Sequence, residues 1–191
     1  MQSVGKFVLL NQAEFPGWLA MQGVKRKISL VQQHHTYIPA YKHFDGTNHF
    51  KLCASMEKSH IERGFSEIGQ NFTTFPDGAI MACRNINTNP AGIKGANSNG
   101  ICIEHLGNFD LNNDIMTLAQ RQIIINVTRD LLAYFKLQAS ENTVIYHHWY
   151  DLNTGKRIVN EGTGTTKSCP GTAFFGGNTV ADFKNNLLPL L

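Results

Sequence analysis

The sequence lacks any long apolar run, and it has few charged residues and little cysteine. Charged residues make up 16% of the 191 residues and hydrophobic residues 42%, which is enough to form a core. No stretch approaches the roughly 20 apolar residues that cross a bilayer, so membrane insertion is not expected. Four cysteines in a chain of this length do not require a disulfide framework. These features predict one compact domain covering residues 1–191.

The N-terminal stretch lacks the features of a secretory signal. Residues 1–10 contain only a short apolar patch, Phe7 to Leu10, and no small-residue cleavage site. We therefore expect either a protein that is made in the cytoplasm and released by another route, or a secreted protein whose signal has been removed.

No block of basic residues and no internal repeat is present. The net charge is +3, and the basic run from Lys25 to Lys27 is short and typical of a solvated turn. Nucleic acid is therefore not an expected partner. Without a repeat, a low-complexity tract or a linker, nothing in the sequence divides the chain into smaller units.

Hydrophobic periodicity and turn residues predict helices that alternate with strands. Pro76-Asp77-Gly78 predicts a hairpin turn, Thr117 with Gln120 predicts a capping box, and Thr47 is expected to cap an earlier helix. Helices are expected at 11–22, 47–61, 117–137 and 179–188, and strands at 28–31, 70–75, 79–82, 100–106 and 144–147. This order predicts an α/β fold with a central mixed, largely parallel β-sheet flanked by helices.

Two histidine pairs and a Cys-Pro-Gly turn indicate a candidate metal site. His34-His35 and His147-His148 end two of the predicted strands, and Cys169 follows in a later loop. A catalytic zinc takes about three protein ligands of these types, and α/β proteins place their sites at strand ends. From these residues alone, a metal site and ordinary surface or core histidines remain equally open.

Several short stretches form an ordered set along the chain. They are His34-His35-Thr36, Arg63 to Gly69 with Asn71-Phe72, Phe75 to Gly78, Asn99 to Glu104, Gly107 to Phe109, Tyr146-His147, and Lys167 to Gly171. Together they resemble the type 2 N-acetylmuramoyl-L-alanine amidases, the superfamily that includes phage amidase lysozymes and peptidoglycan recognition proteins. The resemblance covers about residues 28–175. It implies hydrolysis of the amide between N-acetylmuramic acid and L-alanine in bacterial peptidoglycan, causing lysis or remodelling of the cell wall.

The resemblance also implies one zinc ion (Zn2+) per chain. The residues at the family's ligand positions are His34, His147 and Cys169. Their neighbours His35 and His148 are expected to point to the opposite face of their strands, because side chains alternate along a strand.

The catalytic residues that the resemblance implies include one departure from the family. Lys167 matches a cation that stabilises the charge developing on the carbonyl oxygen. Gln70 stands where many members have Tyr, and an amide cannot act as a general base. Glu104 lies where another branch of phage amidases has its catalytic glutamate, so we expect Glu104 to transfer the proton and Gln70 to orient by hydrogen bonding. Glu67 is the rival base, although an exposed turn position is the preferred interpretation.

Substrate contacts are expected from aromatic side chains near the ligands and from two long loops. Tyr37, Phe44 and Trp149 could stack on sugar or peptide, although aromatic residues near strand ends more often belong to the core. Loops 85–99 and 151–166 are expected to form the lips of a groove. The remaining cysteines are expected to pack as small apolar residues: Cys53, Cys83 and Cys102.

Two other functions stay open. One is a module that binds peptidoglycan without cutting it; in such relatives the Cys ligand is typically replaced, whereas Cys169 is present here. The other is a metal-free hydrolase with Cys169 as nucleophile and a histidine as base. Many family members carry a wall-binding domain, so such a domain beyond Leu191 is also left open, as are the host, the stem-peptide preference and the oligomeric state.

Overall fold

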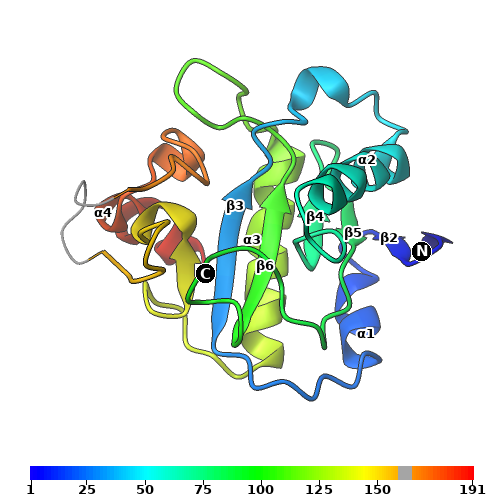
Figure 1. Cartoon of the computed structure of the whole chain (residues 1–191), viewed down its shortest axis with the longest axis horizontal. Coiled ribbons are helices and arrows are strands. Elements are labelled where there is room, and N and C mark those ends of the chain that lie inside the picture. Colours follow the sequence, from blue (N-terminus) through cyan, green and yellow to red (C-terminus); the bar gives the residue numbers. More distant parts are fainter. Residues whose placement is uncertain (159–164) are drawn as a thin grey trace.

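A seven-stranded mixed sheet forms the centre of the computed structural model, which describes residues 1–158 and 165–191. The strand order is β1-β2-β5-β4-β6-β3-β7 (Figure 1). The strands are β1 (Gln2–Val4), β2 (Phe7–Leu10), β3 (Leu30–His35), β4 (Phe72–Thr74), β5 (Ile80–Ala82), β6 (Gly100–His105) and β7 (Val144–Tyr146).

The sheet has a parallel half and an antiparallel half. Strands β4, β6, β3 and β7 pair in parallel, whereas β1, β2 and β5 pair antiparallel, with β5 joined to β4 by the predicted hairpin. The α/β fold with a mixed sheet is therefore confirmed. Because the parallel strands share one direction, the carboxyl ends of β3, β6 and β7 meet at one edge, where sites form in such sheets.

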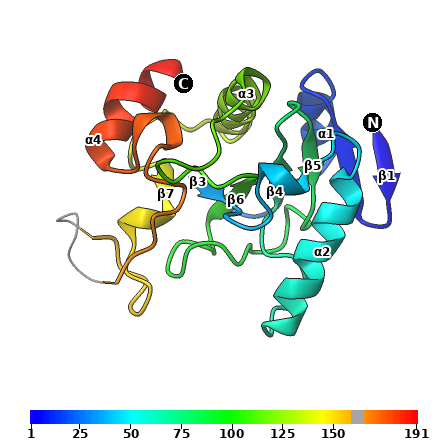
Figure 2. The same cartoon turned by 90° about the horizontal axis from the view of Figure 1, so that it is seen from above.

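Helices cover both faces of the sheet (Figure 2). Helix α2 packs on one face over a cluster that includes Leu52, Met56 and Met81, and α3 packs on the other over a larger cluster that includes Val31 and Ile124. The helices are α1 (Phe15–Ala20), α2 (His49–Glu62), α3 (Leu118–Tyr134) and α4 (Val180–Asp182), which continues as a π-helix (Phe183–Leu187) and a 3-10 helix (Leu188–Leu190); further 3-10 helices are Tyr41–His43, His147–Trp149 and Phe174–Gly176. Within the described residues, no helix is long and apolar enough to span a bilayer.

The start of α3 contains half of the predicted capping box. Thr117 Oγ1 accepts a bond from Gln120 N at 3.0 Å, as expected. The Gln120 side chain, however, donates to the buried carbonyls of Thr74 and Leu106. The Thr74 carbonyl also accepts from Leu106 N at 2.9 Å, and the Gln120 amide adds a bond to each of the two carbonyls. These bonds to buried backbone groups take the side chain away from the helix terminus.

The structure also differs from the predictions in the limits of two helices and in one hairpin. Helix α2 begins after Asn48 and not after Thr47, because the Asp45 carboxylate accepts bonds from the backbone N–H groups of both residues. Helix α1 is shorter than the predicted 11–22. The hairpin of β1 and β2 was not predicted, and it is held by pairing with β5, a long-range contact that local sequence does not reveal.

Candidate metal centre and active site

His34, His147 and Cys169 converge at the carboxyl edge of the parallel strands. His34 lies near the end of β3, His147 opens the 3-10 helix after β7, and Cys169 lies in the loop before the 3-10 helix Phe174–Gly176. The Nδ1 atoms of the two histidines are 3.2 Å apart, and Cys169 Sγ is 3.5 Å from His34 Nδ1. All three side chains are buried, and within the described residues they form the one group of its kind whose ligand atoms lie within 4.8 Å of one another.

These distances fit a tetrahedral zinc site. Bond lengths of about 2.0–2.1 Å for Zn–N and 2.3 Å for Zn–S place tetrahedral ligands about 3.3 Å apart for N and N, and about 3.6 Å apart for N and S. Burial lowers the pKa of His147 to about 4 and that of His34 well below its usual range. Both imidazoles are therefore neutral at neutral pH and have a lone pair to donate.

The Cys169 thiol requires a nearby cation to ionise. Burial raises its pKa well above the usual range when no metal is bound. The backbone N–H of His35 donates to Cys169 Sγ at 3.4 Å, and such a donor stabilises a thiolate. The loop itself is fixed from two sides: Ser168 Oγ donates to the Asp110 carboxylate at 3.0 Å, and His148 N donates to Cys169 O at 2.7 Å.

Glu104 lies beside the ligand group. It pairs in register with His34 across the parallel β3–β6 ladder, so both side chains are on the same face. Burial raises the pKa of Glu104 to about 7, against the opposing charges of Lys167 and Arg63. Near neutral pH the carboxyl group can therefore both accept and donate a proton.

An open cleft of about 1000 Å³ reaches the ligand group. Its walls include Glu104, the exposed side chain of Lys167 and the half-exposed ring of Tyr37. The cleft is therefore large enough for a polymer segment, and it brings a carboxyl group and a cation to the three candidate ligands.

The comparisons with known proteins identify the family. The family model described as N-acetylmuramoyl-L-alanine amidase matches residues 24–172. The chain belongs to this family. No curated protein matches this chain.

Solved structures of amidases and recognition proteins share the fold. The endolysin amidase LysCS from Clostridium intestinale URNW is 22% identical with a TM-score of 0.54, covering 76% of each chain. The amidase LysC from the same organism is 18% identical with a TM-score of 0.57, covering 97% of this chain and 93% of that one. Drosophila peptidoglycan recognition protein SA is 18% identical with a TM-score of 0.61, covering 86% and 82%.

The second histidine of each pair stays outside the ligand group of this amidase-family chain. His35 Nδ1 accepts a bond from Phe109 N at 3.1 Å, and the His35 ring lies against Tyr37 at the cleft. His148 Nδ1 lies 2.7 Å from Lys167 O, where it holds the loop before Cys169. Both side chains thus support the walls of the site.

Two expected substrate contacts lie away from the cleft. Trp149 is in the core: its Nε1 donates to Asn178 O at 2.7 Å and its ring stacks on Tyr146. Gln70 is also buried, and its amide nitrogen donates to Thr73 Oγ1 at 3.0 Å. Neither side chain lines the cleft, so the substrate contacts expected of them are not available in this structure.

The remaining residues and loops that the sequence pointed to have different positions relative to the cleft. Phe44 packs against His49 and Phe75 beneath α2. Residues 159–164 of the second loop lie outside the described residues. Of the first loop, Ala91 and Gly92 do line the cleft, so that part of 85–99 forms the expected lip. The other cysteines are buried, as expected: Cys53, Cys83 and Cys102.

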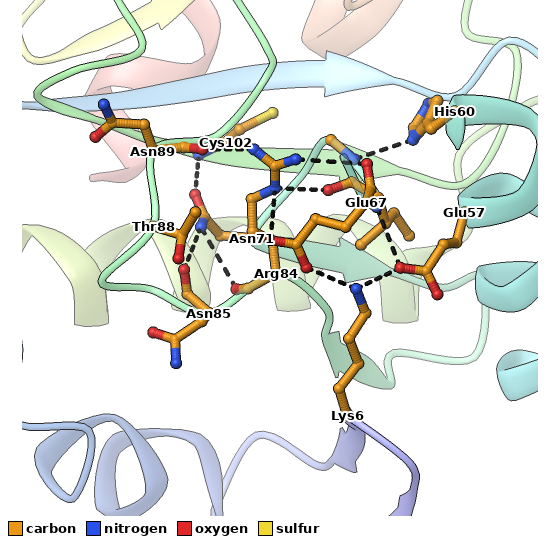
Figure 3. Close-up of polar contacts among 12 residues, drawn as sticks. Lys6, Glu57, His60, Glu67, Asn71, Arg84, Asn85, Thr88, Asn89 and Cys102 are labelled. Carbon is orange, nitrogen blue, oxygen red and sulfur yellow. Dashed lines mark hydrogen bonds and ion pairs between the residues drawn. The ribbon is translucent and has the colours of Figure 1, made fainter. Parts of the chain in front are cut away.

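Glu67, the rival base, belongs to a structural ion network (Figure 3). Its carboxylate pairs with Lys6 at 2.6 Å and with the buried Arg84 at 3.5 Å. Arg84 in turn donates to the carbonyls of Ile68 at 2.7 Å and Asn89 at 2.6 Å. The network ties the segment that carries the family motif to β5, and Glu67 does not line the cleft.

Among the cleft residues that sequence reasoning did not single out are Arg63 and His60. Arg63 follows α2, is exposed, and lies over the Phe65 ring at 5.4 Å. His60, one turn earlier, is buried and accepts from Gly69 N at 3.0 Å. Arg63 is the first residue of the Arg63–Gly69 stretch of the family resemblance, and this was the one sequence signal that could have pointed to it. Its charge acts on Glu104, and that proximity depends on how α2 packs on the sheet.

Proposed function

We propose that the chain is a zinc-dependent N-acetylmuramoyl-L-alanine amidase. It hydrolyses the amide bond between N-acetylmuramic acid and L-alanine in bacterial peptidoglycan, and it acts on the cell wall. The observation that carries this proposal is the convergence of His34, His147 and Cys169 at metal-ligand distances next to Glu104 in an open cleft.

In the proposed reaction, each side chain of the site has one task. A zinc ion held by His34, His147 and Cys169 supplies Lewis acidity at neutral pH. Glu104 accepts a proton from the attacking water and later gives it to the leaving L-alanine nitrogen, for which a pKa near 7 is suited. Lys167 stabilises negative charge on the carbonyl oxygen.

Cleft residues also account for substrate binding. Tyr37 is 53% exposed at the rim, so its ring is available to stack on the sugar or the peptide. Arg63 and Lys167 give the cleft positive charge, which suits a polymer that carries carboxylates.

The two alternatives predict different behaviour. A cysteine hydrolase needs an ionised thiol without metal, and burial instead raises the pKa of Cys169. A recognition module, as in Drosophila peptidoglycan recognition protein SA, is the second candidate because its fold is shared. Retention of a complete ligand set beside Glu104 favours the enzyme.

Digestion of purified peptidoglycan tests the proposal. The wild-type chain should release free amino groups on L-alanine and leave the number of reducing ends unchanged. A chelator should stop the release and added zinc should restore it. Cys169→Ala should abolish the release, whereas the matched control Cys53→Ala, at a buried thiol outside the ligand group, should retain it.

Other outcomes would reject specific parts of the proposal. New reducing ends without new amino groups would indicate a glycosidase. Activity that survives complete metal removal but is lost in Cys169→Ala would indicate a cysteine hydrolase. Binding to peptidoglycan without any release would indicate a recognition module.

A further inference from the structure

Gln32 is a fully buried polar side chain directly behind the candidate metal centre. It precedes His34 by two residues on β3, so both side chains are on the same face. Its Nε2 donates to Ala96 O at 2.9 Å, and its Oε1 accepts from Ile93 N at 3.1 Å. The same Oε1 lies 3.4 Å from His34 Nε2.

These partners fix the orientation of the Gln32 amide. The Ala96 carbonyl can only accept and the Ile93 N–H can only donate, so the amide oxygen must be the atom that faces His34. An amide oxygen can only accept, and the proton between it and His34 must therefore be on Nε2. His34 Nδ1 is left with its lone pair, and Nδ1 is the atom that faces His147 and Cys169.

Two glycines make room for this arrangement. A Cβ atom at Gly92 would lie 2.3 Å from Gln32 Oε1, and one at Gly100 would lie 2.4 Å from Gln32 Nε2. Any larger residue at either position would displace the amide. Gly92 also lines the cleft, so Gln32 connects the cleft loop to a candidate ligand.

We propose that Gln32 is a positioning residue that holds His34 in the Nε2–H tautomer, so that Nδ1 is the metal-binding atom, and that it couples loop 91–99 to the metal centre. The proposal rests on the proposed function for the metal itself. Ligating histidines commonly donate their second N–H to an acceptor, which fixes the ring and raises its basicity. Loss of such an acceptor typically weakens metal binding about 10–100-fold.

The tautomer can be measured on the wild-type chain. Nitrogen-15 NMR of histidine-labelled protein, metal-free and zinc-loaded, should show His34 with a proton on Nε2 and none on Nδ1 in both forms. The signal is assigned by its loss in His34→Ala. A His34 ring protonated on Nδ1 in the metal-free chain, or bound to zinc through Nε2, would overturn the proposal.

Variants test the coupling through zinc affinity, measured by competition with a chromogenic chelator. Gln32→Leu removes the acceptor and should weaken zinc binding about 10–100-fold. Gln32→Glu has nearly the same shape and keeps an oxygen facing His34, so it should lose less zinc affinity, although a buried carboxylate costs free energy of desolvation. Gly92→Ala displaces the amide from the loop side and should also weaken binding.

The results separate this proposal from the proposed function. Equal zinc affinity in Gln32→Leu and wild type, or a larger loss in Gln32→Glu than in Gln32→Leu, would overturn the positioning role. If Gln32→Leu fails to fold, the tautomer of His34 in the wild-type chain and the zinc affinity of Gly92→Ala still test the positioning role. A chain that binds no zinc would reject the metal centre, whereas the tautomer of metal-free His34 would still test Gln32.

Discussion

The substitution Glu104→Gln should make the protein more stable above neutral pH and nearly inactive. Glu104 lies on β6, where the other residues on the same face are Gly100 and Cys102. Burial raises the pKa of Glu104 from an ordinary 4.5 to about 7. Between about pH 4.5 and pH 7, Glu104 therefore keeps a proton in the folded protein that it has released in the unfolded chain. A neutral amide of the same shape avoids that cost but cannot transfer a proton.

The magnitude follows from the pKa difference. From 4.5 to about 7 is about 2.5 units, which at 1.36 kcal/mol per unit is at most about 3 kcal/mol. Because the pKa is raised on folding, this stability is present below pH 4.5, falls as pH rises towards 7, and stays lost above it. Glu104→Gln should therefore gain up to about 3 kcal/mol over wild type at pH 8 and almost nothing at pH 4.

Urea unfolding at pH 4 and pH 8 measures this difference, with chelator present because a bound cation would add charge beside Glu104. Peptidoglycan turnover by the zinc-loaded variant should fall about 10²–10⁴-fold while zinc remains bound. A stability difference that is the same at both pH values would refute the burial argument. Near-normal turnover would refute the catalytic role, and the base would then have to be sought in the metal centre alone.

Three further substitutions test the division between cleft and core. Lys167→Met should lower kcat about 10²–10³-fold without loss of zinc, measured by peptidoglycan digestion and elemental analysis. Tyr37→Ala should mainly raise KM, whereas Trp149→Ala should lower the free energy of unfolding by about 3–5 kcal/mol in a urea titration. Glu67→Gln should leave kcat within a few-fold and reduce stability, which an activity assay and a thermal melt would show; a loss as large as that of Glu104→Gln would contradict our assignment.

Local sequence signals predicted the strands from β3 to β7 but not their limits. Pro76-Asp77-Gly78 predicted the hairpin because turn chemistry depends on neighbouring residues. β3 was expected to end at Val31, since Gln32 and Gln33 interrupt its apolar pattern. Both amides are nevertheless buried, because their partners come from distant segments: Ala96 for Gln32 and His105 for Gln33.

The candidate site was predicted through motifs and not through geometry. Strand order decides that β3 and β7 are neighbours, and periodicity carries no information about strand order. The resemblance supplied His34, His147 and Cys169, and the structure brings them together. Trp149 follows His147 closely in sequence but lies in the core, because nearness in sequence to a ligand does not determine which way a side chain faces after the strand ends.

Zinc content is the most direct test of the account. Elemental analysis of the purified wild-type chain, dialysed against a weak chelator, should find one zinc per chain. The Cys169→Ala chain, treated in the same way, should have lost most of its zinc. Wild-type protein without zinc after expression in metal-replete medium, or unchanged zinc in Cys169→Ala, would contradict the claim that these three residues form a zinc centre.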